Sequence, residues 1–112
     1  MPAPAALSKT PPPPYYAVIF TSVRTEGDHG YDHTARSMVE LAAQQPGFLG
    51  IESVRDASGV GITVSYWASE DSIRAWKANA DHQIAQEGGR QNWYADYQVR
   101  VARVERAYGK SQ

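Results

Sequence analysis

The sequence predicts an α+β fold whose elements follow the order β-α-β-β-α-β. Four separate segments are rich in the β-branched and aromatic residues that favour strands. Two segments, beginning near Tyr31 and Ser69, carry apolar residues at helical spacing. The short turn Ala57-Ser58-Gly59 predicts that the second and third strands form an antiparallel hairpin. This order is that of the ferredoxin-like split unit, which places two helices on one face of a four-stranded antiparallel sheet.

The first strand is expected at residues 15–24, and both of its faces are apolar. Val18 and Phe20 lie in one phase of the strand, while Ile19 and Val23 lie in the other. A strand that is apolar on both faces is typically buried on both faces. Leaving several hundred Å2 of apolar sheet in water would forgo on the order of 10 kcal/mol. We therefore expect a homodimer that packs through its sheet faces into a barrel-like core.

The next elements are bounded by residues that end a helix or make a turn. Tyr31, Ala35, Met38 and Ala42 form one helical stripe, with Asp28 or Asp32 as its cap, and Pro46-Gly47 ends it. The second and third strands are expected at residues 48–56 and 60–68, as a hairpin.

The second helix and the last strand complete the pattern. Ser69 is a good N-cap for a helix that carries Ile73, Trp76 and Ala80 on one stripe. We expect Asp81 to cap a short continuation and Gly88-Gly89 to stop it. The last strand is expected at about residues 94–108, with a bulge near Ala102-Arg103 where the apolar phase shifts.

Length and composition limit the classes of function. The chain has 112 residues, a net charge of −1 and no cysteine. We divide it into a proline-rich arm at residues 1–14, one domain at 15–109 and a short tail at 110–112. The arm is expected to be extended, and either disordered or weakly held, or else bound by a partner subunit. No basic stripe indicates nucleic acid, and no stretch is long enough to span a membrane. The absence of cysteine fits a cytoplasmic location.

Several stretches resemble the antibiotic biosynthesis monooxygenase family. They are "QPGFLGIES" before the second strand, "GITVSYWASEDSIRAWK" with His82 shortly after it, and "GRQNWYADYQVRVARVERAYG" at the end. The resemblance runs from about Tyr15 to Gly109. It implies a small dimeric α+β barrel, in a family that also includes haem-degrading monooxygenases.

Two activities follow from this resemblance. The first is cofactor-independent oxygenation of a flat phenolic molecule in a dry pocket with a tryptophan wall. On this interpretation Trp67, His82 and Arg90 are catalytic, with His82 as the base that deprotonates the phenol. The residues expected to contact the substrate are Thr63, Ser65, Arg74, Trp76, Trp93 and Tyr97.

The second activity is haem degradation, which the residues match only in part. Trp76 fits the helix tryptophan of those enzymes, but Gln86 stands where their iron-binding histidine is expected. The first strand also lacks their asparagine. An amide cannot replace imidazole as a strong iron ligand, so we expect no bound cofactor and no metal.

Each of these residues also has a purely structural interpretation. Trp67 and Trp76 can be core residues, Trp93 and Tyr97 can pack the last strand, and His82 can lie on the surface. Asp28, His29, Asp32 and His33 form a cluster that we do not interpret as a metal site. The alternatives for function are a non-catalytic module that binds a small ligand and a haem-handling protein.

Overall fold

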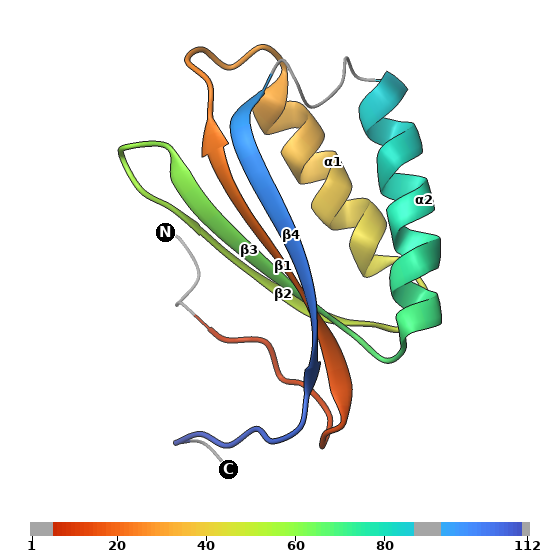
Figure 1. The fold of residues 1–112 in the computed structure, drawn as a ribbon. Coiled ribbons are helices and arrows are strands. Elements are labelled where there is room, and N and C mark those ends of the chain that lie inside the picture. Colours follow the sequence, from red (N-terminus) through yellow and green to blue (C-terminus); the bar gives the residue numbers. More distant parts are fainter. Residues whose placement is uncertain (1–5, 87–92, 111–112) are drawn as a thin grey trace.

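The computed structural model describes residues 6–86 and 93–110, and it has the predicted order of elements. The order is β1 (Tyr15–Arg24), α1 (Tyr31–Ala43), β2 (Phe48–Arg55), β3 (Val60–Trp67), α2 (Glu70–Gln86) and β4 (Tyr94–Val104). The strands form one antiparallel sheet in the order β2-β3-β1-β4. Both helices lie on the same face of this sheet (Figure 1). The ferredoxin-like prediction is therefore confirmed.

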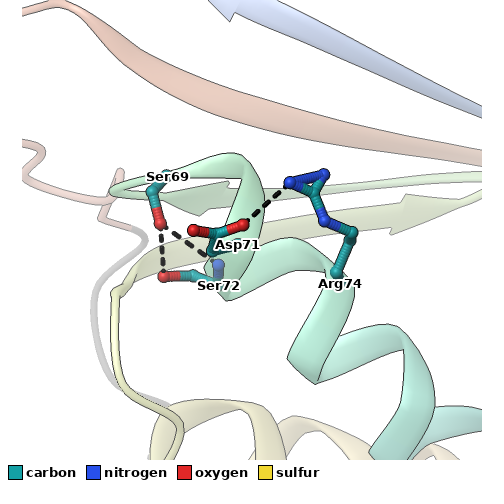
Figure 2. A network of polar contacts seen from close by, with 4 residues as sticks. All are labelled: Ser69, Asp71, Ser72 and Arg74. Atoms are coloured by element: carbon teal, nitrogen blue, oxygen red, sulfur yellow. Dashed lines mark hydrogen bonds and ion pairs between the residues drawn. The ribbon is translucent and has the colours of Figure 1, made fainter.

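Short polar side chains start both helices. The Asp28 carboxylate accepts hydrogen bonds from the backbone N–H groups of Gly30 (3.0 Å) and Asp32 (3.1 Å). Ser69 caps α2, because its hydroxyl accepts the backbone N–H of Ser72 at 3.1 Å (Figure 2). These bonds satisfy amide groups that have no partner within the first helical turn.

The second helix is continuous, whereas a short continuation with its own cap was expected after Ala80. It runs without a break from Glu70 to Gln86, so the predicted new start at Asp81 is wrong. The Asp81 carboxylate instead accepts a 2.6 Å hydrogen bond from Lys77, four residues earlier, which is a pairing that supports a continuous helix. The predicted stop at Gly88-Gly89 lies outside the described residues.

The last strand differs from the prediction in its end and in its bulge. It ends at Val104, and its register with β1 is regular from Val104–Tyr15 to Asp96–Val23. The shift in register lies at the opposite end, between Val23 and Arg24, so the bulge predicted at Ala102-Arg103 is wrong. Val99 and Val101 face the helices, whereas Val104 faces the other side of the sheet and lies beside the buried Tyr15. This change of face explains why the alternation of apolar residues shifts near the end of the strand.

The main core lies between the sheet and the helices, at the end of β3. Ala42, Trp67 and Ile73 are buried there, and Tyr16, Val18, Phe48 and Trp76 pack against them. This core fixes the start of α2 against the sheet.

The face of the sheet away from the helices is partly apolar and partly exposed. Tyr15 and Ala17 are buried on it, but Val54 and Ile62 are 75% and 48% exposed. This face carries the surface on which we expect a second copy to pack.

The proline-rich arm is held by the chain's own edge strand. The Ser8 hydroxyl accepts the backbone N–H of Ile51 (3.0 Å) and donates to the carbonyl of the same residue (3.1 Å). The backbone N–H of Ser8 donates to Glu52 at 3.0 Å.

No helix in the described part of the chain is long and apolar enough to cross a bilayer.

Candidate active site

Two indole rings meet in the space between β3 and α2. Trp67 ends β3, the chain turns at the Ser69 cap, and Trp76 follows in the second turn of α2. Their ring centroids are 5.8 Å apart with an interplanar angle of 22°, which is a stacked arrangement. The ring of Phe48 packs edge-on against Trp67 at 5.5 Å. The short turn between β3 and α2 thus brings the two indoles into contact.

The two indoles differ in their access to solvent. Trp67 is 0% exposed, and its Nε1–H donates to the Ser65 hydroxyl at 2.9 Å. The buried serine thus satisfies a polar atom that would otherwise be costly inside the core. Trp76 is only partly buried. Trp67 is therefore a core residue that packs against Trp76, and Trp76 is the indole that keeps some access to solvent.

An apolar surface continues from these residues toward the edge strand β4. In the register of the sheet, Thr63 of β3 lies beside Phe20 of β1, which lies beside Val99 of β4. Tyr97 and Val101 occupy the same phase of β4 as Val99, and these three residues are 43–51% exposed. We call Phe20, Tyr97, Val99 and Val101 the β4 strip.

Hydroxyl and aromatic groups border this strip. The Thr63 hydroxyl lies 2.7 Å from that of Ser53 on β2. The Phe20 ring contacts the rings of Tyr94 at 5.3 Å and Tyr97 at 5.6 Å. The exposed side of the β4 strip is therefore formed mainly by aromatic and aliphatic side chains.

A second aromatic cluster lies at the other end of the sheet, around Tyr31 at the start of α1. The Tyr31 ring contacts Trp93 at 6.3 Å and Tyr94 at 5.7 Å. Trp93 is buried, and its Nε1–H donates to the backbone carbonyl of His29 at 2.9 Å. Burial, followed by a hydrogen bond with Tyr31, raises the pKa of Tyr94 well above its usual range. The Tyr94 phenol therefore stays protonated.

Two arginines that were not predicted from the sequence join this cluster. The Arg24 guanidinium carbon lies 3.7 Å from the centroid of the Tyr31 ring, and that of Arg55 lies 5.9 Å from it. Arg55 crosses the sheet over Gly61, where an added Cβ would lie 2.5 Å from the guanidinium carbon. A glycine inside a strand is a signal of such a close approach.

The structure does not bring every predicted site residue to the indoles. Arg74 is exposed and pairs with Asp71 at 2.8 Å on the outside of α2 (Figure 2). His82 is also exposed, and it follows Trp76 by six residues, which places it about 240° round the helix axis. Arg90 lies outside the described residues.

Among the described residues, no imidazole is buried beside the tryptophans. All three histidines, His29, His33 and His82, are exposed. Among the described residues, no three His, Cys, Asp or Glu side chains are grouped to hold a metal ion. A haem stacked on Trp76 would find no imidazole on that side of α2.

Comparison with known proteins assigns the family. The model of the family described as "Antibiotic biosynthesis monooxygenase" matches residues 14–88. Uncharacterized protein YqjZ of Bacillus subtilis is 64% identical over 100 residues, covering 89% of this chain and 88% of that protein. Jasmonate monooxygenase ABM of Pyricularia oryzae is 35% identical over 94 residues. That match covers 80% of this chain but only 43% of the fungal protein.

Solved structures show the same fold at low sequence identity. SnoaB, a cofactor-independent oxygenase from Streptomyces nogalater, superposes with a TM-score of 0.70 at 11% identity, covering 88% of this chain and 100% of SnoaB. PA3566 from Pseudomonas aeruginosa superposes with a TM-score of 0.66 at 14% identity, covering 82% and 95% of the two chains. By the family match and by its relatives, this chain belongs to the antibiotic biosynthesis monooxygenase family.

Proposed function

We propose that this protein is a cofactor-independent monooxygenase that acts on a flat aromatic or polycyclic phenolic substrate. The observation that carries the proposal is the family match over residues 14–88, which spans the stacked pair Trp67 and Trp76. The relative named as a jasmonate monooxygenase and the fold shared with the cofactor-independent oxygenase SnoaB support it.

In this reaction the substrate itself supplies the electrons. A base removes the phenol proton, and the electron-rich phenolate then reduces dioxygen. One oxygen atom becomes a new carbonyl on the ring and the other leaves as water, so that a phenol and O2 give a quinone and H2O. The protein's part is to bind the ring, to exclude water and to stabilise the phenolate.

The residues of this chain take separate parts in the proposal. The half-buried ring of Trp76 stacks on the substrate, while the buried Trp67 holds Trp76 in place. The β4 strip forms the apolar side of the site, and the Thr63 hydroxyl lies beside it. His82 as base and Arg90 as the group that stabilises the phenolate are predictions from the sequence, and variants must test them.

Oxygen uptake with 9-anthrol as the probe tests the proposal. We expect the wild type to consume one O2 per anthraquinone formed. Trp76→Ala should lower the rate at least tenfold, because the ring that stacks on the substrate is lost, whereas Trp76→Phe should recover most of it. An unchanged rate in Trp76→Ala would contradict the proposed site. His82→Gln tests the base, and a pH–rate profile that is unchanged in this variant would remove His82 from the mechanism.

A non-catalytic module that binds a small ligand is the second candidate. It is favoured by the exposed position of His82, which lies about 240° round the axis of α2 from Trp76. Such a protein would show quenching of tryptophan fluorescence by 9-anthrol under nitrogen, and no oxygen uptake above the uncatalysed rate in air.

We further propose that the protein is a homodimer that packs through the faces of its sheets, and that it works in the cytoplasm. The exposed Val54 and Ile62, beside the buried Tyr15 and Ala17, support the dimer. A second copy would remove this apolar surface from water without covering the helices or the β4 strip.

A further inference from the structure

We propose that Arg24 and Arg55 form an anion site beside the β4 strip, and that the ligand of this protein carries a carboxylate. The inference shares its ligand surface with the proposed function, but it concerns binding and not turnover. It rests on where the two guanidinium groups lie, on their charge balance, and on the aromatic contacts that join them to the strip.

The two guanidinium groups come from different strands and converge on one ring. Arg24 ends β1 and Arg55 ends β2, and both lie within 6 Å of the Tyr31 ring centroid. Both arginines are partly buried. Such convergence of two cations in a partly buried place is costly unless their charge is balanced.

The hydrogen bonds of these arginines position them but do not balance their charge. Arg24 donates to the backbone carbonyl of Trp93 at 2.7 Å and to the carbonyls of Gly27 and Asp28. Arg55 donates to the Ser22 hydroxyl at 2.8 Å, among other neutral oxygens. All of these acceptors are uncharged.

No carboxylate in the described part of the chain lies within 4 Å of either guanidinium group. The Asp28 carboxylate is nearby in sequence, but it accepts the backbone N–H groups of Gly30 and Asp32. By contrast, the exposed Arg74 and Arg103 each pair with a neighbouring carboxylate. Arg24 and Arg55 are less exposed than these two arginines and lack such a carboxylate. An acidic ligand would therefore serve as their counter-ion.

Donors remain on both groups for such a ligand. A guanidinium has five N–H groups, and the Nε–H groups of Arg24 and Arg55 have no hydrogen-bond partner among the described residues. Carboxylate oxygens accept charge-assisted bonds of this kind, which are about twice as strong as neutral ones.

A chain of ring contacts joins the arginines to the proposed ligand surface. Tyr31, beneath Arg24, contacts Tyr94, and Tyr94 contacts Phe20 of the β4 strip. A ligand whose aromatic body lies on the strip can therefore reach the arginines with an acidic group at one end. The protein would select amphiphilic aromatic acids over neutral molecules of the same shape.

Two probes of matched shape test the inference, measured by calorimetry under nitrogen so that no turnover takes place. We expect wild-type protein to bind 2-naphthoate about tenfold or more tightly than 2-naphthylmethanol, because a hydrogen bond to a charged group is made only with the acid. Arg24→Gln and Arg55→Gln should each remove most of this preference while leaving the affinity for the alcohol within about twofold. Arg36→Gln, which removes an exposed arginine of α1, is the control and should keep the full preference.

Arg55 also holds strands together, so its variant must be shown to fold by circular dichroism. If Arg55→Gln does not fold, Arg24→Gln carries the test. Equal affinity of the wild type for the acid and the alcohol would overturn the inference, as would a preference that survives in Arg24→Gln. Tighter binding of 2-naphthyl phosphate than of 2-naphthoate would overturn the assignment to a carboxylate. Oxygen uptake with 9-anthrol is independent of all these outcomes. The test of the monooxygenase activity can therefore fail while the anion site is confirmed, and the anion site can be overturned while the activity is confirmed.

Discussion

Replacing Trp67 by alanine should destabilise the protein far more than replacing Trp76, although the two rings stack on each other. Trp67 is fully buried, and removing an aromatic side chain from a core costs about 3–5 kcal/mol. Trp76 is partly exposed, so its loss removes one stacking contact of about 0.5–1.5 kcal/mol and only part of a buried area. A domain of this size is stable by about 5–15 kcal/mol in total. Trp67→Ala should therefore lose a large share of the free energy of unfolding of the domain.

Trp67→Phe separates the ring from its hydrogen bond. The phenylalanine keeps an aromatic face for Trp76, but it loses the bond from the indole Nε1–H to the Ser65 hydroxyl, at a cost of about 1–2 kcal/mol. Urea unfolding followed by far-ultraviolet circular dichroism measures all three variants. A loss in Trp67→Ala no larger than that in Trp76→Ala would refute the assignment of Trp67 to the core.

Four further results are expected. Sedimentation of the wild type at micromolar concentration should give a dimer. The Ile62→Asp variant should be a monomer, because it places a charge on the apolar face of the sheet. A monomeric wild type would contradict the proposed dimer. Gly61→Ala should cost no more than about 1 kcal/mol, the worth of one hydrogen bond, because its Cβ would meet only the end of the long Arg55 side chain. A larger loss in urea unfolding would show that the Arg55 guanidinium cannot move aside. Burial, with the hydrogen bond donated to Glu52, raises the pKa of Tyr66 from 10.0 to about 12. The folded state favours the neutral phenol, so the stability that Tyr66 contributes should be present below pH 10 and lost between pH 10 and 12. Ultraviolet titration should show no ionisation of the Tyr66 phenol near pH 10. Titration with haem should give no reductant-driven loss of a Soret band, whereas stoichiometric binding and cleavage would restore the haem-degrading alternative.

Most of the fold could be predicted from local residue patterns. The stripes, the turn Ala57-Ser58-Gly59 and the cap Ser69 each depend on a few neighbouring residues, and each element that they indicated is present. The errors arose where one pattern has two causes. A shift in the alternation of apolar residues near Val104 can mean that the strand contains an extra, bulged residue, or that the apolar residues change to the other face of the sheet. Only the pairing of Val104 with Tyr15 decides between these two causes.

The candidate site was less predictable because its parts come from distant segments. The stack of Trp67 on Trp76 could be predicted, since one short turn joins their elements. The group of Arg24, Arg55 and Tyr31 could not, since it depends on how β1, β2 and α1 meet. Gly61 was the only local sign that a long side chain crosses the sheet there.

Labelling with 18O2 shows whether the protein transfers an oxygen atom from O2 to an aromatic substrate. Purified protein treated with a chelator, and shown to lack haem by its spectrum, is mixed with 9-anthrol under 18O2. We expect anthraquinone that carries one 18O atom, with the second atom in water, at a rate that falls in Trp76→Ala and recovers in Trp76→Phe. Anthraquinone without the label, or formed no faster than in buffer alone, would contradict the assignment of this protein as a cofactor-independent monooxygenase.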